Sequence, residues 1–449
     1  MIRGDGSAER ISAAVCLNTR AIIDGRASPG SSYLTGSPVT RPTERPVRIS
    51  MNISCRRKIS DHHAAHPWSI PTLVALLFTL VLVLAACGQG NGAPSQARPS
   101  SSASHASTPL EEQEKALVAS AVSDPKAITG PATAASVPEV RPISDPQTPQ
   151  LPVDLTDYQG TQVTVKDTSR LLALDLYGTL AETVIGLGQG EKLVGRVTSS
   201  TESSLAGLPL VTESGHDLNV EKILELRPTT VLMDTTNGPL EVTEQLRSAG
   251  ITVVHFSPDR SIDQVVPQIE KVAQALGVPE SGKRLAERVS HELDSVRQTI
   301  HSVVPKDPEK KVAMAFLYVR GNGGVFFILG QGSGADGLIQ ALDGIDVAGK
   351  EHVQDVKPAT SEALVKLNPD LILAMTKGLE STGGLDGFLA RPGVAETTAG
   401  SKKRVVDMAD GQILSFGPNT PAVLLSLAQA IYAPAASGQT PDHAASASP

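Results

Sequence analysis

Cysteine is scarce in this chain, and its few copies all lie at one end. The 449 residues include three cysteines, Cys16, Cys55 and Cys87, all before residue 90. The rest of the chain therefore cannot form a disulfide bond, and it offers no cysteine nucleophile and no cysteine metal site. The sequence also lacks a His-Glu-x-x-His motif, a spacing typical of a catalytic triad and a credible pair of catalytic carboxylates. These absences argue strongly against an exported α/β enzyme such as a hydrolase.

Positive charge is also in short supply. The chain has 39 Lys and Arg against 47 Asp and Glu, a formal charge of −8, and a pI of about 5.7, so nothing indicates a nucleic-acid partner. Glycines cluster at 186–190, 321–324 and 330–334, but none of these clusters fits a Walker or dinucleotide fingerprint. We interpret them as turns, with a phosphate cradle as the alternative for the last two.

An apolar run near the N-terminus has the layout of a secretory signal. Residues 56–58 are basic, residues 70–84 are almost unbroken apolar, and small residues then lead to Cys87. The alternative is one membrane-spanning helix, for which the run is short. Because Leu84-Ala-Ala-Cys87 resembles a bacterial lipobox, we expect residues 51–87 to be a lipoprotein signal peptide and Cys87 to be acylated.

The outer segments are poor in apolar residues. Residues 88–152 and 434–449 are rich in Ser, Ala and Pro, so we predict a disordered linker and a disordered tail, with a short helical pattern at 110–122. Residues 1–50 show no periodicity and are left unassigned. One interpretation is that Met51 is the true start and that the stretch before it is an over-extended reading frame.

A short pattern occurs twice in the remaining part and organises it. The copies begin at Asn219 and Thr360, about 140 residues apart. Each copy has a helix-capping residue, a glutamate in the first turn, apolar residues three apart, a proline and then a short apolar run. Two copies of such a helix–turn–buried-strand unit predict two similar α/β lobes.

Alternating strand and helix patterns fill residues 153–277 and 305–433, which indicates parallel or mostly parallel sheets. Between them, residues 278–304 carry apolar side chains at steps of three and four, as one long helix would. The sequence therefore predicts an α/β fold with two Rossmann-like lobes, joined by one long interlobe helix and separated by a cleft.

Three side chains are candidates for chemistry in this cleft. His216 lies in a loop before the first repeat helix, where a solvated surface residue is the ordinary interpretation and a ligand at a strand end is the alternative. Tyr318 and Arg320 end a strand and share one face. They are either an aromatic beside a solvated arginine or a metal-binding phenolate with a supporting cation, since ferric iron is a hard cation that takes a phenolate oxygen.

Glu221 and Glu362 occupy matched positions in the two copies of the repeat. The simpler interpretation is a favourable placement of negative charge at two helix N-termini. The alternative is a pair of acidic contacts, one on each lobe, for a membrane permease with two-fold symmetry.

Together with the signal peptide, these stretches resemble the substrate-binding proteins of ABC importers, in the class with a rigid interlobe helix that serves haem, cobalamin and ferric siderophores. The resemblance covers about residues 155–434 and the lipobox, and it is closest to actinobacterial haemin-uptake binding lipoproteins. The stretches that carry it are 170–183, 215–219, 317–321 and 332–336. One departure is Pro228-Thr-Thr, where Pro-Asp-Leu is usual at the start of a strand.

The resemblance implies a role for each candidate. Haem, as transported cargo, would lie in the cleft with its iron between His216 and Tyr318, and Arg320 would support the tyrosine. Glu221 and Glu362 would dock on a permease whose ATPase is a separate subunit. The protein would be a non-enzymatic receptor, lipid-anchored at the outer face of the cell membrane. The nearest alternative is the same fold binding a ferric siderophore or cobalamin, and another is a structural wall lipoprotein.

Overall fold

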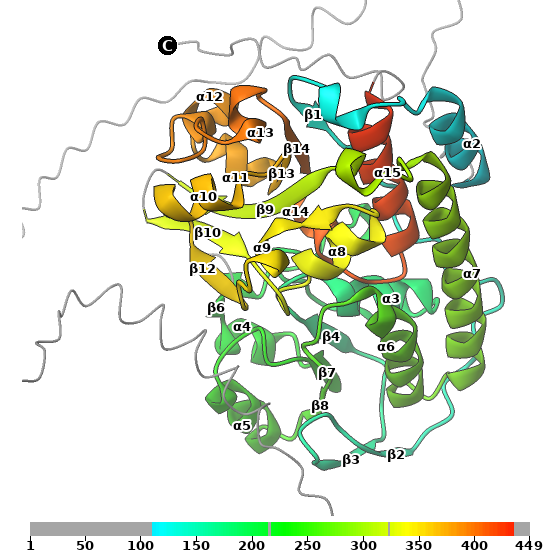
Figure 1. The fold of residues 1–449 in the computed structure, drawn as a ribbon. Helices are drawn as coiled ribbons and strands as arrows, with labels where there is room; N and C mark the ends of the chain where they lie inside the picture. Colours follow the sequence, from blue (N-terminus) through cyan, green and yellow to red (C-terminus); the bar gives the residue numbers. More distant parts are fainter. Residues whose placement is uncertain (1–109, 214–216, 322–323, 435–449) are drawn as a thin grey trace, which may run out of the picture. The chain divides into compact units, whose positions relative to one another are not determined.

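The computed structural model describes residues 110–213, 217–321 and 324–434 (Figure 1). The predicted signal peptide with Cys87, residues 1–50, most of the predicted tail and His216 lie outside the described residues. Within the described part, no helix combines the length and the apolar character needed to span a bilayer.

The first lobe is built on three parallel strands in the order β4-β7-β8. Every residue of β4 and β7 is buried, which is what their unbroken apolar sequence predicts. The strands are β4 (Leu171–Leu174), β7 (Thr230–Met233) and β8 (Thr252–His255), with the hairpins β2–β3 (Val153–Thr156, Gln162–Val165) and β5–β6 (Thr212–Glu213, Asp217–Leu218) beside them. The helices are α3 (Thr179–Gly186), α4 (Val220–Glu225), α5 (Leu240–Ser248) and α6 (Ile262–Ala275).

The second lobe holds a seven-stranded mixed sheet in the order β1-β14-β13-β9-β10-β12, with β11 also paired to β9. Its strands are β1 (Ala132–Thr133), β9 (Ala313–Arg320), β10 (Val325–Leu329), β11 (Ile345–Asp346), β12 (Val356–Pro358), β13 (Leu371–Met375) and β14 (Val405–Met408). Its helices are α8 (Ala335–Ala341), α9 (Val347–Lys350), α10 (Ser361–Leu367), α11 (Thr376–Glu380), α12 (Gly384–Leu389), α13 (Thr398–Ser401), α14 (Asp410–Ile413) and α15 (Thr420–Tyr432).

The prediction of a parallel or mostly parallel sheet is confirmed in its mostly parallel form, and one edge of the sheet is antiparallel. Strands β1, β14, β13, β9 and β11 pair in parallel, whereas β10 pairs antiparallel with both β9 and β12. The reason is the short glycine-containing connection between Arg320 and Val325, since a link of this length joins only antiparallel strands.

The long interlobe helix is confirmed as α7 (Pro279–Val303), with proline in its first turn. Its buried face includes Leu285, Val289, Leu293 and Val296, as the spacing predicted. The helix packs against α6 of the first lobe and against α15 of the second (Figure 1). At a rise of 1.5 Å per residue, α7 is a stiff rod of about 37 Å that contacts both lobes.

The predicted disordered linker is wrong from Leu110 onward, although the short helical pattern predicted within it is confirmed. Residues Leu110–Ser120 form α2, whose Leu117 is fully buried, and β1 pairs in parallel with β14. The chain then follows α7, where the guanidinium groups of Arg284 and Arg288 donate to the carbonyls of Asp145 and Arg141 at 2.6 Å each. The segment is poor in apolar residues, but side chains of α7 supply hydrogen-bond donors for its backbone carbonyls. Its composition alone does not reveal these partners.

Both copies of the repeat fold as predicted. The Asn219 side chain accepts from the Lys222 N–H at 2.9 Å, and the Thr360 hydroxyl accepts from the Ala363 N–H at 3.2 Å. The matched residues Ile223 and Leu364 are fully buried, and each helix leads through its proline into a buried strand.

Candidate functional site

Three buried charges lie beyond the carboxyl ends of the first lobe's parallel strands. Asp175 follows β4, Asp234 follows β7, and Arg260 lies in the loop between β8 and α6. Arg260 Nη2 is 2.6 Å from Asp234 Oδ2 and 3.7 Å from Asp175 Oδ2. This edge of an α/β sheet is where such folds bind ligands. Sequence analysis missed the cluster, although two of its members directly follow apolar strands.

Loop backbone groups hold the two aspartates in place. Asp175 accepts from the N–H groups of Tyr177, Thr179 and Leu180 at 2.9–3.3 Å, which fixes the start of α3. Asp234 accepts from the Thr236 N–H at 2.8 Å. Burial raises the pKa of Asp234 to about 6, although the charge of Arg260 opposes the shift. Burying three charges is costly even when they are paired, so the cluster marks this edge as a candidate functional site.

The Arg260 guanidinium also lies over the ring of Tyr177, with its carbon 4.7 Å from the ring centroid. Burial raises the pKa of Tyr177, and the nearby Asp234, Tyr318 and Asp175 add to this, while the charge of Arg260 opposes it. Tyr177 therefore keeps its proton at neutral pH and is available as a hydrogen-bond donor.

Tyr318 and Arg320 end β9 in the second lobe, and the structure brings them together as predicted. The guanidinium carbon of Arg320 lies 4.8 Å from the centroid of the Tyr318 ring. Its Nη2 is 2.5 Å from Asp410 Oδ2 and 3.3 Å from Met375 Sδ, and its Nη1 donates to the Val319 carbonyl at 3.1 Å. Sequence analysis did not single out Asp410, but the residue follows the buried strand β14 closely, as Asp175 follows β4.

The two lobes contact each other beside these residues. Tyr177 of the first lobe and Tyr318 of the second both pack against one hydrophobic cluster. The Thr179 hydroxyl donates to the Ser415 carbonyl across the lobes. A side-chain carbon added at Gly334 would lie 2.8 Å from Phe416 and 3.0 Å from Arg260, so glycine permits this close approach.

Glu182 of α3 is buried within the same lobe contact. It accepts from the Asn419 N–H, and Gly417 lies directly against its carboxyl group. Burial raises the pKa of Glu182 to about 8, the nearby Glu202 adds to the shift, and hydrogen bonds from Asn419 and Ser415 oppose it. Burial likewise raises the pKa of Glu202 to about 7. A lone glutamate in the otherwise uncharged stretch 179–187 was the signal that sequence analysis passed over.

The other predicted site residues divide into two groups. Glu221 and Glu362 are both exposed, in the first turns of α4 and α10. His216 and Cys87 fall outside the described residues. In the part of the chain that the structure describes, no group of three His, Cys, Asp or Glu side chains is arranged to hold a metal ion.

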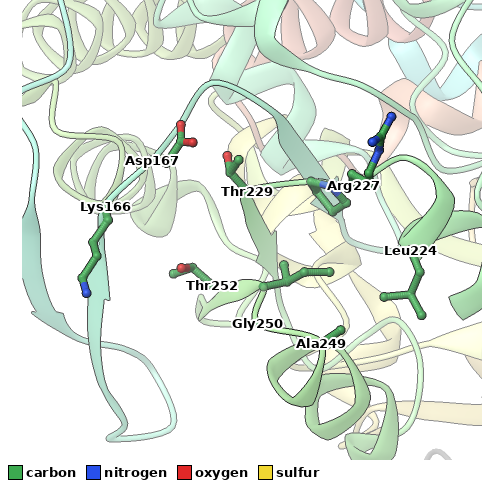
Figure 2. A pocket seen from close by; sticks show the side chains of 10 residues that line it. Lys166, Asp167, Leu224, Arg227, Thr229, Ala249, Gly250 and Thr252 are labelled. Atoms are coloured by element: carbon green, nitrogen blue, oxygen red, sulfur yellow. The ribbon is translucent and has the colours of Figure 1, made fainter.

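Two cavities lie away from these residues. One, of about 540 Å³, borders the amino ends of β7 and β8, and Figure 2 shows Lys166 and Arg227 on opposite sides of it. The other, of about 970 Å³, lies along the outer faces of α6 and α7. None of the predicted site residues lines either cavity.

Known proteins resemble the chain over most of this fold. A family model described as periplasmic binding protein matches residues 176–410. A solved variant of the heme binding protein HmuT is 44% identical, with a TM-score of 0.70 over 72% of this chain and 100% of that one. The periplasmic heme-binding protein RhuT from Roseiflexus sp. RS-1 is 34% identical, with a TM-score of 0.55 over 60% of this chain and 100% of that one.

A curated relative is also named as a substrate-binding protein. The uncharacterized ABC transporter substrate-binding lipoprotein YvrC of Bacillus subtilis is 27% identical over 291 residues, which are 64% of this chain and 87% of YvrC. The family model covers more than half of the chain, and its matched region contains both tyrosine–arginine pairs. The chain therefore belongs to the periplasmic binding protein family.

Proposed function

We propose that this protein binds haem outside the cell membrane and delivers it to an ABC permease. The observation that carries the proposal is the Arg320-stacked Tyr318 at the lobe contact, in a chain 44% identical to a heme binding protein. The solved HmuT variants replace a tyrosine, an arginine two positions further on, and a histidine. Tyr318 and Arg320 have the same spacing. As a family member, the protein is a non-enzymatic binding protein, and haem is its cargo.

The proposed chemistry is axial ligation of ferric haem by side chains of opposite lobes. Tyr318 supplies a phenolate oxygen, which suits the hard ferric ion, and His216 supplies a neutral imidazole nitrogen. Arg320 supports the tyrosine by lying over its ring, with the guanidinium carbon 4.8 Å from the ring centroid. Because Tyr318 is the anionic ligand, its loss should weaken haem binding more than the loss of His216.

A haemin titration followed by visible absorption tests the proposal. The parent should give a saturable one-to-one shift of the Soret band, and Tyr318→Phe and His216→Ala should each alter it. Tyr158→Phe is a matched control, because Tyr158 is 47% exposed in the β2–β3 turn. A parent without a saturable shift would refute haem as the cargo and favour the same fold binding a ferric siderophore or cobalamin.

We also propose that Glu221 and Glu362 dock on a permease with two-fold symmetry, one contact for each lobe. Both glutamates are exposed, and an exposed apolar residue lies one turn further on in each helix. Leu224 is 37% exposed and Val365 is 50% exposed, at matched positions of the repeat. Each lobe thus offers a similar acidic and apolar contact, which suits a symmetric partner.

Charge reversal separates docking from haem binding. Glu221→Lys and Glu362→Lys should reduce haem-dependent growth while leaving the haemin titration unchanged. Glu241→Lys is the control, because Glu241 is exposed on the neighbouring helix α5. Normal haem-dependent growth with a variant that carries both Glu221→Lys and Glu362→Lys would exclude the docking role.

The protein is an extracytoplasmic binding protein, and we propose that acylation of Cys87 anchors it to the membrane. The lipobox motif supports this, as does the similarity to a lipoprotein of Bacillus subtilis. In this proposal residues 51–87 are the signal peptide, and residues 88–109 remain as the linker. Cys87→Ser should release the protein into the medium, and retention in the membrane fraction would contradict the anchor.

A further inference from the structure

We propose that residues 132–150 form a strap that holds the two lobes together, with Glu139 and Gln412 as the positioning residues that close it and slow the release of cargo. The restraint on the lobes follows from contacts within the chain. The effect on cargo release rests on the proposed function, because it assumes that haem is bound between the lobes.

The first part of the strap is attached to the second lobe. It begins with β1, which pairs in parallel with β14. The Gln412 side chain then holds the backbone of Val137 on both sides, because its oxygen accepts from the Val137 N–H at 3.1 Å and its Nε2 donates to the Val137 carbonyl at 2.9 Å. Asn419 Nδ2 donates to the next carbonyl, that of Pro138, at 2.6 Å. The second lobe therefore holds the strap as far as Pro138.

The strap passes to the first lobe at the very next residue. Glu139 accepts from Ser203 Oγ at 2.8 Å, from the Ser204 N–H at 3.4 Å and from the Ser204 hydroxyl. Both serines lie in the first lobe, between α3 and β5. The Ile143 N–H then donates to the Gly186 carbonyl of α3 at 3.0 Å. Because opposite lobes hold adjacent residues of the strap, the lobes cannot separate here without breaking these hydrogen bonds.

The lobes also touch directly beside the strap, at α14. A side-chain carbon added at Gly411 would lie 2.7 Å from Thr201 Oγ1 and 2.8 Å from the Ser199 carbonyl oxygen, so glycine permits this close approach. Gly411 directly precedes Gln412, and Thr201 lies two residues before Ser203. The contacts thus form a closed ring, which runs from α14 to the strap, from the strap to the first lobe, and back to α14.

The same helix also contacts the support of the proposed cargo ligand. Asp410 Oδ2 lies 2.5 Å from Arg320 Nη2, and the Arg320 guanidinium lies over the Tyr318 ring. Asp410, Gly411 and Gln412 are consecutive residues of α14. One helical turn therefore contacts the arginine beside the ligand, the first lobe and the strap. Opening the strap should loosen both the lobe contact and the cargo site.

Two variants open the strap at opposite ends. Glu139→Ala removes the acceptors for the first-lobe serines, and Gln412→Ala removes both hydrogen bonds to Val137. Because either change breaks the same link, the double variant should resemble each single variant, and the two effects should not add. Gln429→Ala is the matched control, since it removes a hydrogen bond between α15 and α2 and leaves both ends of the strap in place.

Hydrogen–deuterium exchange of the cargo-free protein measures the restraint on the lobes. The Asn419 N–H donates to Glu182 across the lobes, so its exchange reports their separation. We expect it to be about tenfold faster in each strap variant, as the loss of about one net hydrogen bond would give. Amides of β7, inside the first lobe, should exchange as in the parent. Parental exchange at Asn419, or equal acceleration in β7, would overturn the strap.

Transfer of haemin from the loaded protein to an excess of apomyoglobin measures the effect on cargo. Both strap variants should release haemin about tenfold faster than the parent, and Gln429→Ala should match the parent. Parental release from a variant with accelerated exchange at Asn419 would overturn the effect on cargo. A parent that binds no haemin would overturn the proposed function, and the exchange measurement would still decide whether the strap restrains the lobes.

Discussion

Replacing Glu182 with glutamine should stabilise the protein at neutral pH and leave its stability unchanged in acid. The carboxyl is buried between the lobes, and its pKa is raised from its usual value of 4.5 to about 8. Between these values the unfolded chain has released a proton that the folded chain keeps. By linkage, stability therefore falls as pH rises through this window.

The size of the effect follows from the width of that window. One pH unit corresponds to about 1.4 kcal/mol for a single group. At pH 7.5 the buried Glu182 carboxyl group therefore destabilises the folded state by up to about 4 kcal/mol. Glutamine does not ionise, and its side-chain oxygen can still accept from the Asn419 N–H. We expect Glu182→Gln to raise the free energy of unfolding by about 2–4 kcal/mol at pH 7.5 and by almost nothing at pH 4.

Urea unfolding followed by circular dichroism, at both pH values and without haem, measures this difference. Glu241→Gln on the exposed face of α5 is the control and should have little effect at either pH. Equal changes at pH 4 and pH 7.5 would refute the buried-acid argument, as would a Glu182→Gln variant that is less stable at pH 7.5. A smaller fall between pH 4.5 and pH 7 should remain in the variant, because the pKa of Glu202 is also raised.

Three further outcomes are expected. Leu117→Ala should lower the free energy of unfolding, measured with urea, by about 2–5 kcal/mol, because Leu117 is fully buried. A change below about 0.5 kcal/mol would show that α2 does not pack against α7 and α15. Asp410→Asn should weaken haem binding in the haemin titration, because Asp410 Oδ2 lies 2.5 Å from Arg320 Nη2 and holds that guanidinium over the Tyr318 ring; haem affinity equal to that of the parent would contradict this. Gly334→Ala should destabilise the protein, because Gly334 has a φ of +91° and an added side-chain carbon would also crowd Phe416 and Arg260. An unchanged melting temperature would refute both the strain and that packing.

Local patterns in the sequence were sufficient for much of the fold. The capping residues Asn219 and Thr360, the prolines that follow and the apolar runs fixed two helix–strand units, because each signal acts over a few residues. The spacing of three and four residues fixed α7 in the same way. The linker prediction failed because Leu117 and β1 are stabilised by α7, α15 and β14, which lie far away in the sequence.

The candidate site also has one part that the sequence predicts and another that depends on the tertiary structure. The sequence by itself determined that Tyr318 and Arg320 share a strand face, since two residues apart on a strand always do. Only the tertiary structure decided that Arg260 meets Asp175, Asp234 and Tyr177, because parallel strands bring distant loops to one edge of a sheet. The tertiary structure also decided that the second lobe encloses Glu182. Burial depends on what the rest of the chain packs against a residue, and the raised pKa of Glu182 follows from its burial.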